Sequence, residues 1–110
     1  MNISESTQND IRIIQPQGRV DSEGAIDLEL SLHEAYQAGS HQMILDLSNV
    51  SYINSAGLRI LAEMLTRTQG SGGDFLVAGP SQKIRRVFQI IGFDNFFRLF
   101  DDVESAVQAF

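Results

Sequence analysis

The stretch ILDLSNVSYINSAGL, from Ile44 to Leu58, decides how the fold of this chain is interpreted. A short apolar run ends at Asp46, a polar loop follows, and a helical pattern begins at about Ser55. Apolar side chains then recur at helical spacing at Leu58, Ile60, Leu61, Met64 and Leu65. The pattern predicts a strand, a loop and a helix that runs to Gln69, with Ser55 at the start of the helix.

The residues before this stretch predict one strand and one helix. Ile11, Ile13 and Ile14 indicate a strand that Pro16 would end or push to a sheet edge, while residues 2–7 fit either a short edge strand or a disordered start. Asp21 or Ser22 can cap the helix that follows, and Gly39 is a plausible stop. Met43–Leu47 is apolar enough for a strand that is covered on both faces.

The second half continues the alternation of helices and strands. The run Gly70-Ser71-Gly72-Gly73 is interpreted as a helix stop and turn, and Phe75–Ala78 as a buried strand. Ser81 can cap a helix that ends at Gly92, and a last short strand is expected near residues 98–100. A final helix, with a capping box from Asp101 to Glu104, is expected to bury Val103, Ala106, Val107 and Phe110. This order predicts an α/β fold with largely parallel strands, in a single domain over residues 1–110.

Composition and charge exclude several classes of function. The 110 residues include no cysteine, so there is no disulfide framework and no thiolate metal site. The net charge of −6 disfavours nucleic acid and anionic membranes as partners, and no apolar run has the length of a membrane-spanning helix. With a polar start in place of a signal peptide, the expected location is the cytoplasm.

The acidic excess lies in residues 1–55, which contain 8 acids and 2 bases. Five acids gather on the first predicted helix and at its start: Asp21, Glu23, Asp27, Glu29 and Glu34. This face is either simply solvated or an acidic surface that selects a basic partner.

Two interpretations of Ser55 remain open from position alone. It is either a helix-capping or first-turn serine, or a phosphorylation site whose phosphate would meet free backbone N–H groups and the positive end of the helix dipole. Arg59 lies one turn further along the same face and could pair with such a phosphate, and Glu63 continues that stripe.

Catalytic, cofactor and metal sites are not expected. Ile53 stands where a hydrolase elbow needs glycine, and neither His33 nor His41 has a motif that links it to Ser55. Asp46 follows a strand as in a phosphoacceptor receiver domain, but the acidic pair and the lysine of such a domain are missing, so a structural loop anchor is preferred. The glycine-rich run lacks a Gly-Lys-Ser/Thr ending, and no cluster of acids and histidines has metal-ligand spacing.

The central stretch resembles the signature of STAS domains, named for sulfate transporters and anti-sigma factor antagonists. The matching segments are Asp46-Leu47-Ser48-Asn49-Val50, Ile53-Asn54-Ser55-Ala56-Gly57-Leu58, Gly18-Arg19-Val20-Asp21, Gly73-Asp74-Phe75-Leu76-Val77 and Val87-Phe88-Gln89-Ile90-Ile91-Gly92. The resemblance covers about residues 11–110, and the chain is similar to the small free-standing anti-sigma factor antagonists of bacteria.

This resemblance implies a fold and a function. The fold is a mixed sheet of four or five strands with about four helices packed mainly on one side. The function is partner switching without catalysis: the unphosphorylated protein binds a serine kinase that is also an anti-sigma factor, phosphorylation of the serine at Ser55 releases it, and a PP2C-type phosphatase restores it. The partner-binding residues implied are Asp21, Asn54, Ser55, Ala56, Gly57 and Arg59.

The chain departs from the family pattern at two positions. Asn54 stands where many members have aspartate, and Pro16 falls within a segment that should be a strand. The alternative function is therefore a STAS scaffold that binds a partner or small ligand constitutively, with an output other than a sigma factor.

Overall fold

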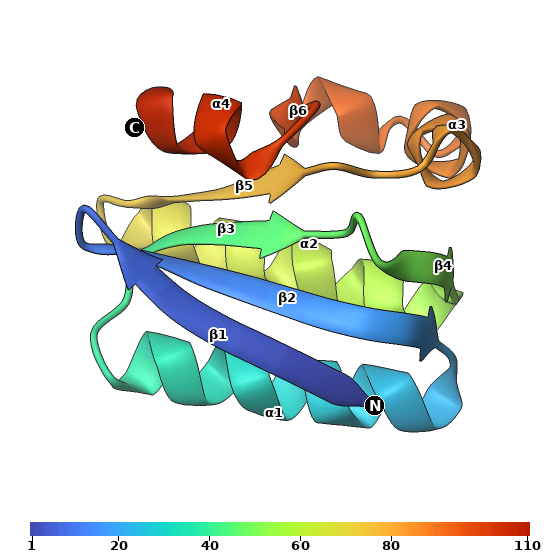
Figure 1. Cartoon of the computed structure of the whole chain (residues 1–110), viewed down its shortest axis with the longest axis horizontal. Helices are drawn as coiled ribbons and strands as arrows, with labels where there is room; N and C mark the ends of the chain where they lie inside the picture. The colour runs from blue at the N-terminus through green and yellow to red at the C-terminus, as the bar shows by residue number, and fades with distance from the viewer.

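The computed structural model describes all 110 residues and shows a mixed β-sheet covered by helices (Figure 1). Its elements are β1 (Asn2–Gln8), β2 (Ile11–Val20), α1 (Ser22–Gln37), β3 (Gln42–Asp46), β4 (Val50–Ile53), α2 (Ser55–Gly70), β5 (Asp74–Ala78), α3 (Gln82–Ile90), the 3-10 turn η1 (Phe93–Asn95), β6 (Leu99–Phe100) and α4 (Val103–Gln108). The strand order is β1-β2-β3-β5-β6, and β4 pairs with β2 beyond the end of β3. Only β1 runs antiparallel to its neighbour.

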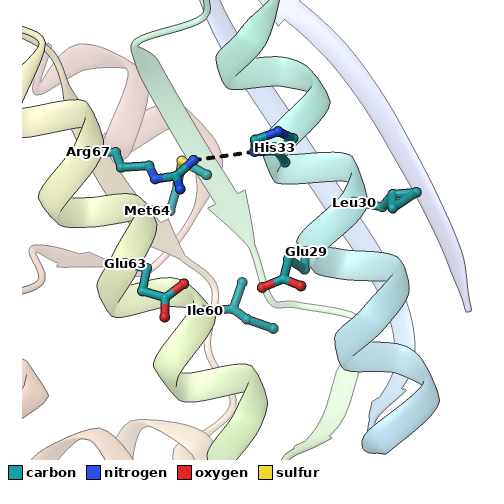
Figure 2. Close-up of a pocket in the computed structure, with 7 residues that line it drawn as sticks. All are labelled: Glu29, Leu30, His33, Ile60, Glu63, Met64 and Arg67. Carbon is teal, nitrogen blue, oxygen red and sulfur yellow. Dashed lines mark hydrogen bonds between the residues drawn. The ribbon is translucent and has the colours of Figure 1, made fainter.

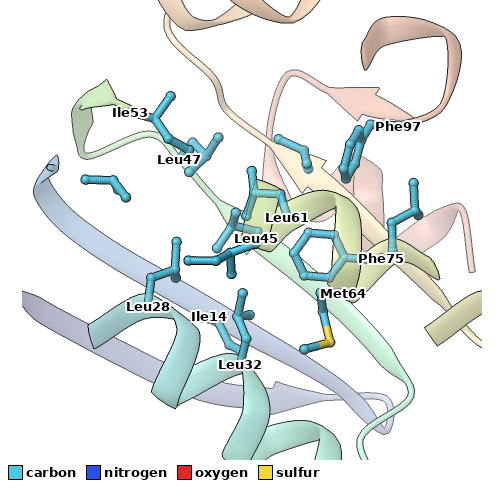
Figure 3. Packing of buried hydrophobic residues seen from close by; sticks show 14 of the residues in the cluster. Ile14, Leu28, Leu32, Leu45, Leu47, Ile53, Leu61, Met64, Phe75 and Phe97 are labelled. Atoms are coloured by element: carbon cyan, nitrogen blue, oxygen red, sulfur yellow. The ribbon is translucent and has the colours of Figure 1, made fainter. Parts of the chain in front are cut away.

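The two faces of the sheet are covered unequally. Side chains from α1, α2 and α3, such as Leu28, Leu61 and Phe88, form the larger core with one face of β2, β3 and β5. Figure 3 shows Leu28 and Leu61 of this core beside Ile14, Leu45 and Phe75 of the strands. On the other face, Ala106 and Val107 of α4 cover a smaller cluster. The prediction of an α/β fold with helices mainly on one side is therefore confirmed, and β1 and β4 bring the sheet to six strands.

β2 continues through Pro16, so the prediction that proline ends this strand or moves it to an edge is wrong. The strand pairs with β1 from Ile11 to Gln17, with β3 only at Arg12–Ile14 and with β4 only from Gly18. Pro16 thus lies in an interval where one side of β2 has no strand partner, and its missing N–H is tolerated there. At Gly18, whose φ is +105°, the β2–β4 register shifts.

The predictions for the C-terminal segment need two corrections. Asp102, not Asp101, caps α4, because its Oδ1 accepts a hydrogen bond from Ser105 N–H at 2.8 Å, and this bond lowers the pKa of the Asp102 carboxyl below its usual value. Phe110 lies beyond the end of α4 and is 39% exposed, so it does not join the core. None of the helices combines the length and the hydropathy needed to cross a bilayer.

Candidate functional site

The starts of α1 and α2 lie next to each other at one edge of the sheet. β2 and β4 are parallel, with Val20 paired to Ile53, and each strand is followed directly by a helix cap. The Asp21 carboxylate accepts a hydrogen bond from Gly24 N–H at 2.9 Å, and the Asn54 side chain accepts one from Gly57 N–H at 2.8 Å. Parallel strands thus bring together Asp21 and the Asn54–Gly57 motif, which are 33 positions apart in the sequence.

Ser55 occupies the first helical position of α2 and has no structural task there. Its side chain is exposed, and its hydroxyl makes no hydrogen bond within the chain because Asn54 already caps the helix. The backbone N–H groups of Ser55 and Ala56 also lack acceptors, whereas that of Leu58 bonds to Asn54 O. Ser55 is therefore a first-turn serine and not the cap, and its hydroxyl is free of intramolecular partners; both interpretations of Ser55, a first-turn serine and a phosphorylation site, are compatible with this position.

The neighbours of Ser55 in the motif have clear structural roles. Ala56 packs partly buried against the larger core. Gly57 is buried, and a Cβ on it would lie 2.7 Å from Val20 Cγ1 and 2.8 Å from Ile53 Cγ1. The missing side chain therefore lets α2 approach the strand ends closely, which fixes where Ser55 is presented.

Arg59 lies one turn after Ser55 and is free to reorient. Its side chain is 71% exposed, and its Nε is 3.9 Å from Glu63 Oε1, a distance at which an exposed ion pair contributes little. The structure therefore brings Arg59 onto the same surface as Ser55 but does not pair it with any group near the helix start.

Arg19 and Tyr52 form a further contact beside this site that sequence reasoning missed. They are opposite each other on β2 and β4, and the Arg19 guanidinium carbon is 4.3 Å from the centroid of the Tyr52 ring. This is a cation–π contact. Only the pairing of β4 with β2 reveals it, and residues 50–53 were interpreted as part of a loop.

The remaining candidates have structural roles. Asp46 is 5% exposed, and its carboxylate accepts hydrogen bonds from Gln15 Nε2 at 2.6 Å and from Ser48 N–H at 3.0 Å, as expected of a loop anchor. His33 contacts Arg67 with 3.3 Å between Nδ1 and Nη1 (Figure 2), and His41 lies against the ring of Tyr36. No three His, Cys, Asp or Glu side chains are grouped to hold a metal ion.

Replacing Asn54 by alanine is expected to destabilise the chain by about 1 kcal/mol, because Gly57 N–H loses its acceptor at the start of α2. Urea unfolding of the variant and the wild type measures this difference. Asn54→Asp, which retains the cap, should be at least as stable as the wild type. Asn49→Ala is the matched control, because the exposed Asn49 side chain makes no hydrogen bond. Equal unfolding midpoints for Asn54→Ala and the wild type would contradict the capping role.

Comparisons with known proteins agree on one family. The family profile described as STAS domain matches residues 2–106. A putative anti-sigma factor antagonist, BtrV, of Bordetella bronchiseptica is 33% identical over 94 residues, which cover 86% of this chain and 81% of that protein. The crystal structure of a putative anti-sigma factor antagonist from Thermotoga maritima superposes with a TM-score of 0.92 at 23% identity, covering 97% of this chain and 92% of that one. The Bacillus cell fate determinant SpoIIAA, solved in its phosphorylated form, has a TM-score of 0.76 at 17% identity and covers 98% of both chains.

Proposed function

Because this chain belongs to the STAS domain family, we propose that it is an anti-sigma factor antagonist that acts by partner switching. In its unphosphorylated form it binds an anti-sigma factor that is also a serine kinase, in the cytoplasm, and thereby frees a sigma factor. The chain is the ligand and substrate of that kinase and performs no catalysis itself. Its relatives named as anti-sigma factor antagonists support this assignment.

The proposed switch is phosphorylation of Ser55. The kinase transfers the γ-phosphoryl group of ATP to Ser55 Oγ, the hydroxyl proton is lost, and ADP leaves. A PP2C-type phosphatase hydrolyses the phosphate ester and restores the hydroxyl. The observation that carries this proposal is the exposed Ser55 hydroxyl without a partner, at a helix start that Asn54 already caps.

Charge explains how this modification would release the partner without unfolding the chain. A phosphate adds about 1.5 to 2 negative charges, next to Asp21 and the acidic start of α1. The free N–H groups of Ser55 and Ala56 and the helix dipole stabilise that charge within the chain. A partner surface that fits the neutral serine would instead meet a bulky dianion, which opposes binding.

The test is phosphorylation by candidate kinases encoded in the same genome. After incubation with ATP and Mg²⁺, intact-protein mass should rise by one phosphate, and peptide mapping should place it on Ser55. Ser55→Ala should remain unmodified, while the control Ser51→Ala, at an exposed serine in β4, should be modified like the wild type. A phosphate on Asp46 would be lost in acid, whereas a serine phosphate survives.

The neutral Asn54 favours one alternative function, a STAS scaffold that binds its partner constitutively. An aspartate before the serine would add a charge that a kinase could recognise, and asparagine supplies only the cap. Tight binding to a candidate kinase without any phosphorylation would support this alternative and replace the switch. In that case Asn54→Asp is the first variant in which phosphorylation should be sought.

A further inference from the structure

The outer face of α1 carries an apolar ridge framed by acids. Ile26 and Leu30, one helical turn apart, are 65% and 58% exposed, on the side opposite the buried Leu28 and Leu32. Figure 2 shows Leu30 projecting from α1 away from α2. The helix has four acids, Glu23, Asp27, Glu29 and Glu34, and no lysine or arginine.

Three of these acids are unpaired. Asp27 contacts the N-terminal ammonium of Met1, but Glu23, Glu29 and Glu34 make no ion pair within the chain. Leu30 borders two surface hollows of about 310 and 320 Å³; the first is lined by Glu29 and Glu63 together with Arg67, and the second by Glu34 together with Asp27, which pairs with the Met1 ammonium. Glu29 and Glu34 are therefore the unpaired carboxylates on the two sides of the ridge, while Arg67 lines the first hollow from α2.

The outer face of α3 has the opposite character. Ile90 is 73% exposed, and the exposed Arg86 and Lys83 lie on the same face, one and two turns before it respectively. Neither of these two bases has an acidic partner in the chain, whereas Arg85 pairs with Asp101 at 3.2 Å. The helix contains no acid. The exposed apolar side chain of Ile90, next to the unpaired bases Lys83 and Arg86, thus complements the ridge on α1.

From this complementarity we propose that α1 of one molecule binds α3 of a second copy, with Ile90 packed between Ile26 and Leu30. Lys83 and Arg86 would then face Glu29 and Glu34 across the contact. This inference goes beyond the proposed switch and does not depend on Ser55. α1 and α3 lie apart in the molecule (Figure 1), so the contact joins two different surfaces and repeats head to tail.

One helix pair buries less than the roughly 1,200 Å² of the smallest stable interfaces, so the association is expected to be weak and readily reversible. The net charge of −6 opposes assembly at long range, and salt screens both this repulsion and the attraction between the charged groups at the contact. The association should therefore be measured at near-physiological ionic strength, where the long-range repulsion is screened.

Analytical ultracentrifugation of the full chain, up to about 1 mM, tests this proposal. The weight-average mass should rise with concentration at near-physiological ionic strength. Leu30→Ser and Ile90→Ser should each stay monomeric, while Phe110→Ser, an exposed apolar residue elsewhere, should associate like the wild type. Circular dichroism checks that the variants are folded.

Mixing the two variants gives the decisive result. Leu30→Ser retains an intact α3 and Ile90→Ser an intact α1, so the mixture should form a heterodimer and nothing larger. A constant monomer mass for the wild type would overturn the proposal. So would a mixture that remains monomeric, or single variants that associate as the wild type does.

Discussion

Ser55→Asp is expected to weaken binding to the kinase partner about thirtyfold, which corresponds to about 2 kcal/mol, whereas Ser55→Ala should bind like the wild type. The reason is the position of Ser55 on the binding surface that we propose, where a carboxylate would add negative charge beside Asp21. A single carboxylate carries less charge than a phosphate, so the phosphorylated protein should bind more weakly still.

Isothermal titration calorimetry with the kinase and ADP measures these affinities without phosphorylation. Ser51→Asp is the control, because it adds the same charge at an exposed position of the preceding strand. Equal affinities for Ser55→Ala and Ser55→Asp would contradict the switch.

The loss of binding by Ser55→Asp is expected without any loss of stability. Aspartate at the first position of a helix interacts favourably with the helix dipole, by about 0.3 to 1 kcal/mol. The variant should therefore be as stable as the wild type or slightly more stable. Thermal unfolding of both proteins separates an effect on the binding surface from an effect on the fold.

The elements with a strong apolar period could be predicted from the sequence. The apolar stripe from Leu58 to Leu65 predicts α2, and the capping residues Asp21 and Ser81 predict the starts of α1 and α3. The structure shows both caps. In these helices local propensity and tertiary packing favour the same conformation, so the apolar period and the capping residues are sufficient to predict the helix.

The sequence does not predict β4, and for β1 it fits either an edge strand or a disordered start, because nothing local specifies either strand. β1 is polar and mostly exposed, and it is held by backbone pairing with β2. β4 is four residues long, and only Val50 and Ile53 are buried. A polar strand such as β1 and a very short strand such as β4 both depend on pairing with a neighbouring strand, which the periodicity of one segment cannot show.

The candidate site was predicted in part for a similar reason. Asn54 and Ser55 are both good capping residues, and the sequence does not say which of them performs that task. The hydrogen bond from Gly57 N–H to Asn54 decides the question and leaves the Ser55 hydroxyl free. The proximity of Asp21 follows from the β2–β4 register, which depends on the strand that was missed.

Gly73→Ala is expected to destabilise the chain by about 3 kcal/mol or more. A Cβ at this position would lie 1.7 Å from the carbonyl oxygen of His41 and 2.5 Å from its carbonyl carbon. Those atoms are backbone, and the same oxygen accepts the hydrogen bond from Asp74 N–H at 3.0 Å that begins the pairing of β3 with β5. A change of side-chain rotamer cannot relieve this clash, because the His41 atoms are backbone. The start of the β3–β5 pair must move instead.

Gly70→Ala is the matched control because it lies in the same glycine-rich segment. A Cβ there meets nothing within 4 Å, and Gly70 is the last residue of α2, where alanine is the better helix former. This variant should be as stable as the wild type or gain up to about 0.5 kcal/mol. Urea unfolding should thus rank the proteins as Gly70→Ala, wild type, Gly73→Ala, with a melting temperature roughly 10 °C or more below the wild type for the last. Equal losses of stability in both variants would contradict this prediction. They would mean that Gly73 is needed only for the flexibility of the turn, and that its close approach to the His41 backbone does not restrict the residue at this position.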